Sequence, residues 1–446
     1  MTLKEHFRKN ITLAYPVMLS QMGHILVAVA DSMMVGRLGT VPLASVSLAN
    51  SVFSIIMLFG IGVSYGMTPL VAAADGANDK RSGAKIFKHG VFLNTVLGIM
   101  LVLMGLLIGK SLVFLDQDPQ VLAGALPYFY TLVFSLLPLM VFQAFRQFTE
   151  GLSMTRQAMY ISISGNVLNV FFNYGLIYGE MGMPELGMVG AGWASLISRI
   201  IMAIAMVIFV LSYGKLRRYV ILWTKIKLHA AVMKKILHIG IPSGMQYIFE
   251  IGAFSMAAVM VGWIGAEALA AHQIALNLSA ITYMIATGIS AAGAIRTGNQ
   301  LGRKDYTTLR RAGLTCFAMV AIMMAFFGAV FIMGNTYLPT WYIKDPVVIQ
   351  MAGSLLIIAA FFQISDGVQA VGLGVLRGIA DVKVPTLVTL FAYWLMAIPL
   401  AYLFGIYLDW GAIGIWIALL IGLTIAAILH LIRFHLLSKY FIVKNR

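Results

Sequence analysis

The chain has 446 residues, of which 61% are hydrophobic and only 11% are charged, about half the roughly 25% charged share of a soluble globular protein. This composition excludes a soluble globular, disordered or collagen-like chain, and the single cysteine, Cys316, excludes an internal disulfide. Lys and Arg number 31 against 16 Asp and Glu. In a membrane protein this excess is typical of cytoplasmic loops, so we expect no nucleic-acid partner.

Long apolar runs recur along the whole chain. Each has roughly 20 residues, the length of helix that crosses a hydrocarbon core of about 30 Å. The runs are continuous, whereas the strands of a membrane barrel alternate polar and apolar residues. The sequence therefore predicts an all-α integral membrane protein with twelve transmembrane helices, at about residues 12–35, 46–70, 89–109, 126–149, 158–179, 189–211, 240–263, 272–295, 312–333, 350–374, 385–407 and 411–433.

The basic residues predict the orientation of these spans. Twelve spans place both termini on the same side, and nearly all Lys and Arg residues then fall on that side. The opposite side holds only Arg37, Lys110 and Lys344. Because basic loops stay in the cytoplasm, we expect a multi-pass protein of the plasma (inner) membrane with both termini cytoplasmic. The first span lacks a small-residue cleavage site and is expected to be retained.

One long basic linker divides the chain. Residues 212–239 contain seven Lys or Arg and no acid, and they separate six spans in 1–211 from six in 240–446. Shifting the second half by 226 residues aligns Pro16 with Pro242, Gly36 with Gly262, Gly39 with Gly265, Leu43-Ala44 with Leu269-Ala270, Gly62 with Gly288, Gly76 with Gly302 and Asp79 with Asp305. The sequence thus predicts two pseudo-symmetric six-helix bundles, the architecture of secondary transporters. A repeat kept only for packing is the alternative.

Three carboxylates fall inside predicted spans: Asp31, Glu250 and Asp366. An acid in mid-span costs roughly 2.5–3.5 kcal/mol on insertion scales, so it persists where it is protonated, bound to a cation or paired. Arg199 lies within a span and offers a structural partner for one of them. One arginine does not neutralise three acids, so at least some of them are expected to handle protons or metal ions.

Glu250 and Asp366 belong to the same half of the chain, each about midway along its span. Their hard oxygen ligands suit Na⁺ or H⁺ rather than a transition metal. Tyr283, in the neighbouring span, adds a hydroxyl group, although a tyrosine there is also explained by packing. We expect Glu250, Asp366 and Tyr283 to form a cation site, with the two acids as metal ligands if the ion is Na⁺.

The fifth span carries three asparagines, Asn166, Asn169 and Asn173. Spacings of three and four residues place them on one face of a helix. Such amides either join helices or line a polar cavity. In the second interpretation they face Asp31 and, with it, bind substrate or a proton.

We expect an ion gradient, rather than ATP, to supply the energy for transport. The nearest approach to a phosphate-binding loop, Gly105 to Ser111, is one residue short, and the eight histidines form no metal-binding pair. We therefore expect no cofactor, apart from Na⁺ or H⁺ as the coupling ion.

Together these features resemble the multidrug and toxic compound extrusion (MATE) family, in its NorM-like branch. The similarity covers nearly the whole chain. Its local motifs are Glu150-Gly151-Leu152, Gly182-Met183-Pro184-Glu185-Leu186-Gly187, His272-Gln273-Ile274-Ala275-Leu276-Asn277, Gln363-Ile364-Ser365-Asp366 and Leu376-Arg377-Gly378.

The resemblance implies a V-shaped pair of bundles that exports cationic amphipathic compounds in exchange for Na⁺ or H⁺. By position, Glu250, Asp366 and Tyr283 match the family's cation site, and Asp31 matches its polar cavity in the N-terminal lobe, together with the three asparagines. Phe361 and Phe362 stand where a tyrosine often lies near the tenth-span Asp. We expect a monomer whose partners are these small molecules and membrane lipids.

Two other functions compete with efflux: a lipid flippase and a membrane-bound enzyme. The motifs favour neither, so we do not expect the protein to be an enzyme. A lipid-linked oligosaccharide flippase of the same superfamily needs several cationic residues to hold pyrophosphate, but this chain has one mid-span arginine and three mid-span acids. An integral membrane transferase needs a cluster such as DDxxD or paired histidines, and none occurs.

Overall fold

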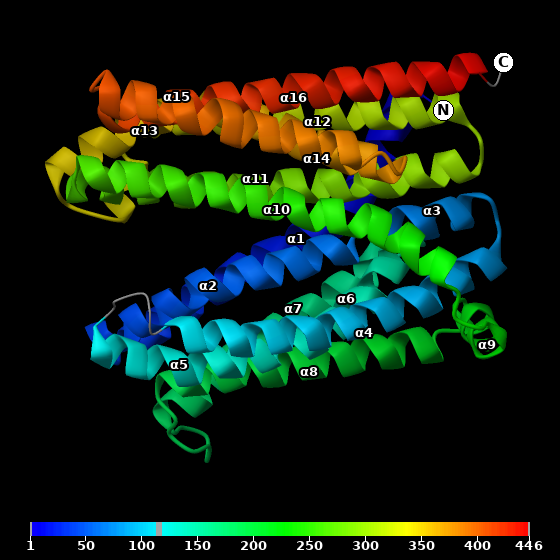
Figure 1. The fold of residues 1–446 in the computed structure, drawn as a ribbon, viewed down its shortest axis with the longest axis horizontal. Coiled ribbons are helices and arrows are strands. Elements are labelled where there is room, and N and C mark those ends of the chain that lie inside the picture. The colour runs from blue at the N-terminus through cyan, green and yellow to red at the C-terminus, as the bar shows by residue number, and fades with distance from the viewer. Residues whose placement is uncertain (1, 113–117, 445–446) are drawn as a thin grey trace. The chain divides into compact units, whose positions relative to one another are not determined.

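The computed structural model describes residues 2–112 and 118–444, and the regular elements in these ranges are helices (Figure 1). The first half contains α1 (Leu3–Gly36), α2 (Thr40–Ser64), α3 (Thr68–Gly76), α4 (Lys80–Ser111), α5 (Pro119–Phe134), α6 (Leu136–Gly151), α7 (Thr155–Tyr178) and α8 (Met188–Ser212). After α9 (Arg217–Lys225), the second half contains α10 (Ala230–Ile264), α11 (Ala266–Gly302), α12 (Tyr306–Met333), η2 (Leu338–Trp341), α13 (Pro346–Gly378), α14 (Lys383–Leu390), η3 (Phe391–Ala397), α15 (Ile398–Tyr402), η4 (Leu403–Tyr407) and α16 (Gly411–Lys444).

Eleven helical segments of the described ranges are long and apolar enough to cross a membrane. Three of them combine successive helices: α2 with α3, α5 with α6, and α14 through η4. The remaining predicted span, residues 158–179, corresponds to α7 (Thr155–Tyr178), a helix of 24 residues. Its serines and asparagines make it more polar than the other eleven. The predicted all-α membrane fold is therefore confirmed, and each predicted span coincides with one helix or with successive helices.

The internal repeat is visible in the backbone as well as in the residues. Gly39 (φ 128°) and Gly265 (φ 150°) precede α2 and α11 and lie 226 positions apart. Gly187 (φ 55°) and Gly411 (φ 62°) hold the corresponding positions at α8 and α16. Positive φ values of this kind favour glycine, which explains why these glycines recur in both halves.

The aligned aspartates are helix caps. Asp79 Oδ1 accepts a hydrogen bond from the Ser82 backbone N–H (2.9 Å) at the start of α4. Asp305 Oδ1 accepts the equivalent bond from Thr308 (3.0 Å) at the start of α12. Each carboxylate satisfies a backbone donor that the first helical turn leaves free. The repeat therefore extends to the details of the turns between helices.

The chain forms two compact units, residues 19–244 and residues 1–18 with 245–446. We call them the 19–244 unit and the 245–446 unit. Residues 1–18 join the latter through Arg296 of α11, which donates to the His6 carbonyl oxygen (3.1 Å) and to Asn10 Oδ1 (2.5 Å). Conversely, a Cβ at Gly240 of α10 would lie 2.4 Å from the Val63 carbonyl oxygen, in the 19–244 unit.

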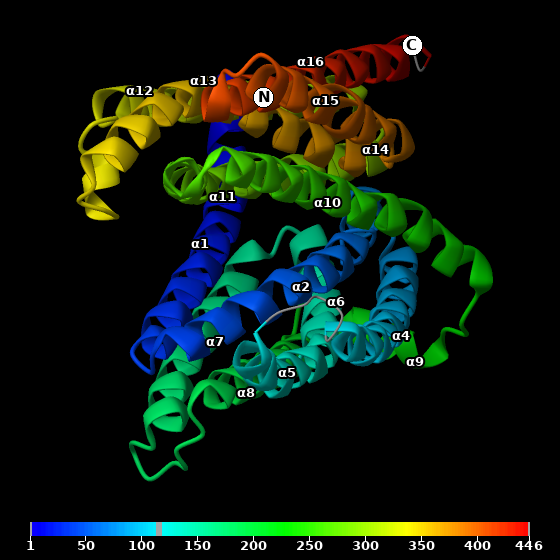
Figure 2. The same cartoon turned by 60° about the vertical axis from the view of Figure 1, so that its left-hand side comes forward.

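These units differ from the predicted lobes, 1–211 and 240–446. The first helix of each half, α1 and α10, is long and continuous (Figure 2), and each contributes its first part to the other half's compact unit. The breaks at residues 18 and 244 are again 226 positions apart, so the exchange follows the repeat. Hydropathy alone does not reveal it, because residues 18 and 244 both fall inside predicted apolar spans.

The predicted linker, 212–239, is largely helical rather than extended. It contains α9 and the beginning of α10. Lys88 Nζ donates to the carbonyl oxygens of Trp223 (3.0 Å) and Ile226 (2.7 Å), and the Trp223 ring meets Phe87 edge to face with centroids 4.7 Å apart. Helix α9 therefore packs beside the beginning of α4 (Figures 1 and 2).

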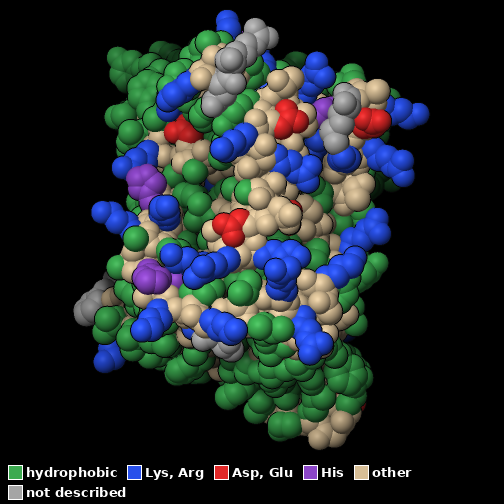
Figure 3. Space-filling model, turned by 90° about the vertical axis from the view of Figure 1, so that its right-hand side faces the viewer, with side chains coloured by type: hydrophobic (Ala, Val, Ile, Leu, Met, Phe, Trp, Pro, Cys, Tyr) green, Lys and Arg blue, Asp and Glu red, His purple; other side chains and the backbone are tan. Residues whose placement is uncertain are grey.

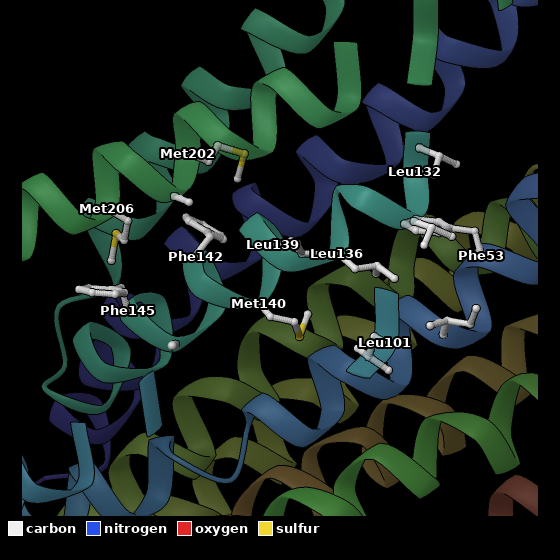
Figure 4. Packing of buried hydrophobic residues seen from close by; sticks show 14 of the residues in the cluster. Phe53, Leu101, Leu132, Leu136, Leu139, Met140, Phe142, Phe145, Met202 and Met206 are labelled. Atoms are coloured by element: carbon white, nitrogen blue, oxygen red, sulfur yellow. The ribbon is translucent and has the colours of Figure 1, made fainter. Parts of the chain in front are cut away.

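The core of the 19–244 unit is built from large apolar side chains. Figure 4 shows Leu136, Leu139, Met140 and Phe142 of α6 packed among residues from neighbouring helices. Leu136 and Met140 are fully buried. This helix corresponds to the second part of α13, which carries Asp366, so equivalent helices line an apolar core in one unit and a polar centre in the other.

Candidate functional site

Two buried carboxylates lie near each other in the 245–446 unit. Glu250 belongs to α10 and Asp366 to α13, and their exposures are 9% and 7%. The two acids interact electrostatically. Tyr283 of α11 and Gln369 of α13 are the polar side chains that interact with the Glu250 carboxylate. The structure thus brings together Glu250, Asp366 and Tyr283, which the sequence placed in three separate spans.

This cluster has unused capacity to bind a cation. Asp366 Oδ1 and Gln369 Nε2 are buried without a hydrogen-bond partner. Among the described residues, no Lys, Arg or His lies within ion-pair distance of Glu250 or Asp366. The described residues contain no group of three or more His, Cys, Asp or Glu side chains that could hold a metal ion. Carboxylate, hydroxyl and amide oxygens are the donor set for a hard cation or a proton.

Sequence analysis missed two members of this cluster. Gln369 lies one helical turn after Asp366, a spacing that would have identified it, and it is fully buried. Tyr393 is also fully buried, and its hydroxyl donates to Gln369 Oε1 (3.4 Å). Tyr393 lies in η3, a π-helical segment, and such segments occur frequently at functional sites. Its position in an apolar run gave no signal.

A second polar cluster lies in the 19–244 unit. The Asn173 side-chain amide donates to Asp31 Oδ1 and to Asn169 Oδ1, the latter at 3.0 Å. Asn169 Nδ2 in turn donates to Ser195 Oγ of α8 (3.3 Å). The predicted juxtaposition of Asp31 with Asn169 and Asn173 is therefore present in the structure, and Ser195 is an addition to it.

Individual contacts between α1 and α7 position this cluster. Gly23 of α1 has no side chain, and a Cβ there would lie 2.5 Å from Asn166 Nδ2. The Tyr178 hydroxyl donates to the Met34 carbonyl oxygen (2.7 Å). Residues further along α1 contact residues further along α7, so the two helices run parallel. Asn166 therefore lies two turns from the Asp31–Asn173 pair, and its Nδ2 has no hydrogen-bond partner.

Arg199 of α8 forms no ion pair with any of the three mid-span acids. Its Nη1 donates to Ser135 Oγ (2.5 Å), Nη2 contacts Met57 Sδ (3.5 Å), and its guanidinium lies 5.2 Å from the centroid of the Phe53 ring. It interacts electrostatically with Asp31. No carboxylate among the described residues lies within ion-pair distance of Arg199.

The repeated six-helix architecture, with polar clusters buried inside both units, defines a membrane transport protein of the secondary-transporter type. The chain belongs to the MatE family, whose model matches residues 16–175 and 242–403. The two matched segments begin 226 positions apart, at the same offset as the repeat.

Curated relatives match over nearly the full length of the chain. The probable multidrug resistance protein NorM of Pseudomonas putida is 32% identical over 423 residues, which cover 94% of this chain and 92% of the relative. The multidrug resistance protein NorM of Photobacterium profundum is 30% identical, with coverage of 96% and 94%.

Solved structures share the fold at lower identity. An outward-facing multidrug resistance MATE family transporter of the MOP superfamily matches with a TM-score of 0.88 and 22% identity, covering 98% of this chain and 96% of that one. A crystal structure of MATE in the straight conformation matches with a TM-score of 0.90 and 21% identity, covering 98% and 97%. These likenesses establish the fold of the chain.

Proposed function

We propose that the protein is a secondary multidrug efflux antiporter that exports cationic amphipathic compounds in exchange for Na⁺ or H⁺. The observation that carries this proposal is the pair of buried acids, Glu250 and Asp366, which have no basic partner among the described residues. Two neighbouring carboxylates in a low-dielectric site bind a cation or share a proton in order to stay buried. Such a pair is suited to load and release the coupling ion.

The names of the curated relatives support multidrug efflux, since they describe multidrug resistance proteins. The sign of the buried charges favours cationic cargo. Asp31 adds a third mid-span acid, whereas Arg199 is the one Lys or Arg that the sequence places near the middle of a predicted span, since Arg146 and Arg433 lie at span ends. A flippase for pyrophosphate-linked lipids would need the opposite balance, so we do not favour it.

We further propose that the two clusters divide the work. Glu250, Asp366 and Tyr283 bind the coupling cation, while Asp31 with Asn166, Asn169 and Asn173 binds substrate or a proton. Alternating access couples them, because an ion drives transport only through its different affinities for the inward and outward states.

We propose that the protein is a monomer in the inner membrane and that both of its termini lie in the cytoplasm. The face of the molecule shown in Figure 3 carries many Lys and Arg side chains and few acidic ones, as expected of a cytoplasmic surface. Within the 245–446 unit, both chain termini lie at the same end (Figure 1).

Proteoliposomes test the proposal directly. A fluorescent cationic dye is loaded, and its efflux is followed under an imposed Na⁺ gradient, an imposed H⁺ gradient or neither. We expect one gradient to drive efflux by the wild-type protein, and Glu250→Gln and Asp366→Asn each to abolish it. The amides keep the size of the side chains but neither release a proton nor neutralise Na⁺.

Protein content and the monodispersity of each purified variant serve as controls for folding. Wild-type efflux that ignores both gradients would contradict an ion-driven antiporter. Full efflux in both variants would show that the acid pair has only a structural role.

A further inference from the structure

The repeat shows which residues of the 19–244 unit stand where the acid cluster stands in the other unit. The offset is 226 at Pro16 and at Gly39, so no insertion separates them and His24 corresponds to Glu250. It is also 226 at Asp79, so Met57 corresponds to Tyr283.

The counterpart of the second acid is apolar. The Asp-Pro starts of α5 (Asp118) and α13 (Asp345) lie 227 positions apart, and so do Ser153 and Ala380, both at positive φ. With this offset Leu139 corresponds to Asp366. Leu139 is part of the apolar core of the unit (Figure 4). The 19–244 unit therefore has no counterpart of the acid pair.

In the 19–244 unit, the positively charged Arg199 lies where the other unit has the acid pair. Arg199 enters from α8, at the position of Leu423 in the other half, and its Nη2 contacts Met57, the counterpart of Tyr283. His24, the counterpart of Glu250, is exposed, unlike Glu250, and interacts electrostatically with Arg146 and with Arg199. The same place in the repeat thus holds two carboxylates in one unit and a guanidinium with an imidazole in the other.

The Arg199 guanidinium retains capacity for an anion. It has five N–H donors, and among the described residues its one hydrogen bond to an oxygen is the bond to Ser135 Oγ. A guanidinium within a membrane span is otherwise paired with an acid or faces a polar cavity. Asp31 is close enough to interact with it electrostatically but lies beyond ion-pair distance.

Two further polar atoms of α7, one beside Asp31 and one two turns away, lack hydrogen-bond partners among the described residues. They are Asn166 Nδ2 and Asn173 Oδ1. Asp31 with the free Asn173 Oδ1 suits a cationic group, whereas Arg199 suits a carboxylate, which matches the planar guanidinium fork. The separation of the two charges would let one ligand contact both without displacing an internal ion pair.

We propose that Arg199, anchored by Ser135 and assisted by His24, is a binding subsite for the carboxylate of a zwitterionic cargo whose cationic group is bound by Asp31. The inference rests on the proposed export of cationic amphipathic compounds and adds a determinant of specificity to it. A cargo without a carboxylate uses the Asp31 cluster alone.

A matched pair of dyes tests the subsite. Rhodamine 19 carries a free carboxylate, and rhodamine 6G is its ethyl ester, so the two share one cationic ring system. Binding of each dye to the purified detergent-solubilised protein is measured by fluorescence anisotropy. We expect Arg199→Gln to weaken rhodamine 19 binding by about tenfold or more, the effect of losing a hydrogen-bonded charge, and to affect rhodamine 6G much less.

Three variants sharpen the comparison. Arg199→Lys keeps the charge without the fork, so its affinity for rhodamine 19 should lie between those of the wild type and Arg199→Gln. It also replaces Arg199→Gln as the test if that variant does not fold. His24→Ala should weaken rhodamine 19 more than rhodamine 6G, whereas Asp31→Asn should weaken both dyes.

Equal losses for both dyes in the Arg199 variants, or unchanged binding of rhodamine 19, would overturn the subsite. Because binding needs no gradient, the two proposals fail separately. A protein that binds both dyes with the expected pattern but exports neither contradicts the antiporter proposal alone. A protein that exports rhodamine 6G but shows no Arg199-dependent preference contradicts the subsite alone.

Discussion

Two buried glutamates, Glu150 and Glu250, provide a test of whether the acid pair is structural or functional. Both lie in membrane-spanning helices and are nearly inaccessible, with exposures of 4% and 9%. Glu150 forms an ion pair with Arg146 one turn earlier, with Arg146 Nε 2.6 Å from Glu150 Oε1. Glu250 has no basic partner among the described residues. The same substitution, Glu→Gln, should therefore have opposite consequences at the two positions.

The expected magnitudes differ by several kcal/mol. The side chains of Arg146 and Glu150 are only 6% and 5% exposed, and removing one partner of such a buried pair costs roughly 3–5 kcal/mol because the other charge stays buried. At roughly 2–4 °C per kcal/mol, Glu150→Gln should lower the melting temperature by roughly 6–20 °C. Glu250→Gln removes an unpaired buried charge, so its stability should stay within about 1 kcal/mol of the wild type or rise.

Thermal unfolding of the purified variants, followed by intrinsic fluorescence in one detergent and at constant ionic strength, measures both effects. Dye efflux from proteoliposomes supplies the functional comparison, in which Glu250→Gln should be inactive despite its stability. If Glu250→Gln were destabilised as strongly as Glu150→Gln, the charge of Glu250 would be needed for folding. The argument for an ion-binding role would then be wrong.

Two other predictions concern the helix ends. A cysteine at Lys225, an exposed position at the end of α9, should react with an impermeant thiol reagent only after permeabilisation in a protein that lacks Cys316; labelling of intact cells would reverse the proposed orientation. Asp79→Ala should lower stability by about 1 kcal/mol at neutral pH, because it removes the cap of α4. Hydrogen bonds from the Ser82 hydroxyl and backbone N–H lower the pKa of Asp79, so its contribution is present above the unfolded-state pKa of about 3.9 and is lost as the pH falls through the lower folded value. If the difference in melting temperature between wild type and Asp79→Ala were the same at pH 3 as at pH 7, the assignment of ionised Asp79 as the cap of α4 would be refuted.

Much of the fold follows from sequence because two strong signals act independently. Apolar length identifies the helices, and the repeat of Gly39 with Gly265 and of Asp79 with Asp305 identifies their turns. The exchange of the first parts of α1 and α10 was not predictable, since packing rather than hydropathy determines it. Helix α9 was missed for a related reason: its nine residues are too few to span, and contacts with Lys88 and Phe87 hold it in place.

The candidate sites follow from sequence to the extent that a charged residue in mid-span is unusual. Asp31, Glu250 and Asp366 were identifiable by their cost in a membrane. Tyr393 was not, because an aromatic residue in an apolar run is ordinary, and only the packing of η3 brings its hydroxyl to Gln369. Whether Arg199 pairs with an acid was also undetermined, since hydropathy places it in the membrane but does not give the direction of its side chain.

The proposed division of work between the two units leads to a last prediction, on Asp31→Asn. Asp31 accepts a hydrogen bond from the neutral Asn173 amide, has no basic residue within ion-pair distance among the described residues, and lies in the 19–244 unit, whereas Glu250 and Asp366 both lie in the other unit. Asp31→Asn should therefore impair drug export while Na⁺ affinity stays within about twofold of the wild type. Glu250→Gln should lose about a thousandfold, since opposite charges about 4 Å apart are worth about 4 kcal/mol at an effective dielectric constant near 20. Calorimetry on the purified proteins measures Na⁺ binding, and proton release on drug addition replaces it if the wild type binds no Na⁺. Equal losses in both variants would mean one shared site, because a coupling that acts only through alternating access changes transport without removing the ion's own ligands.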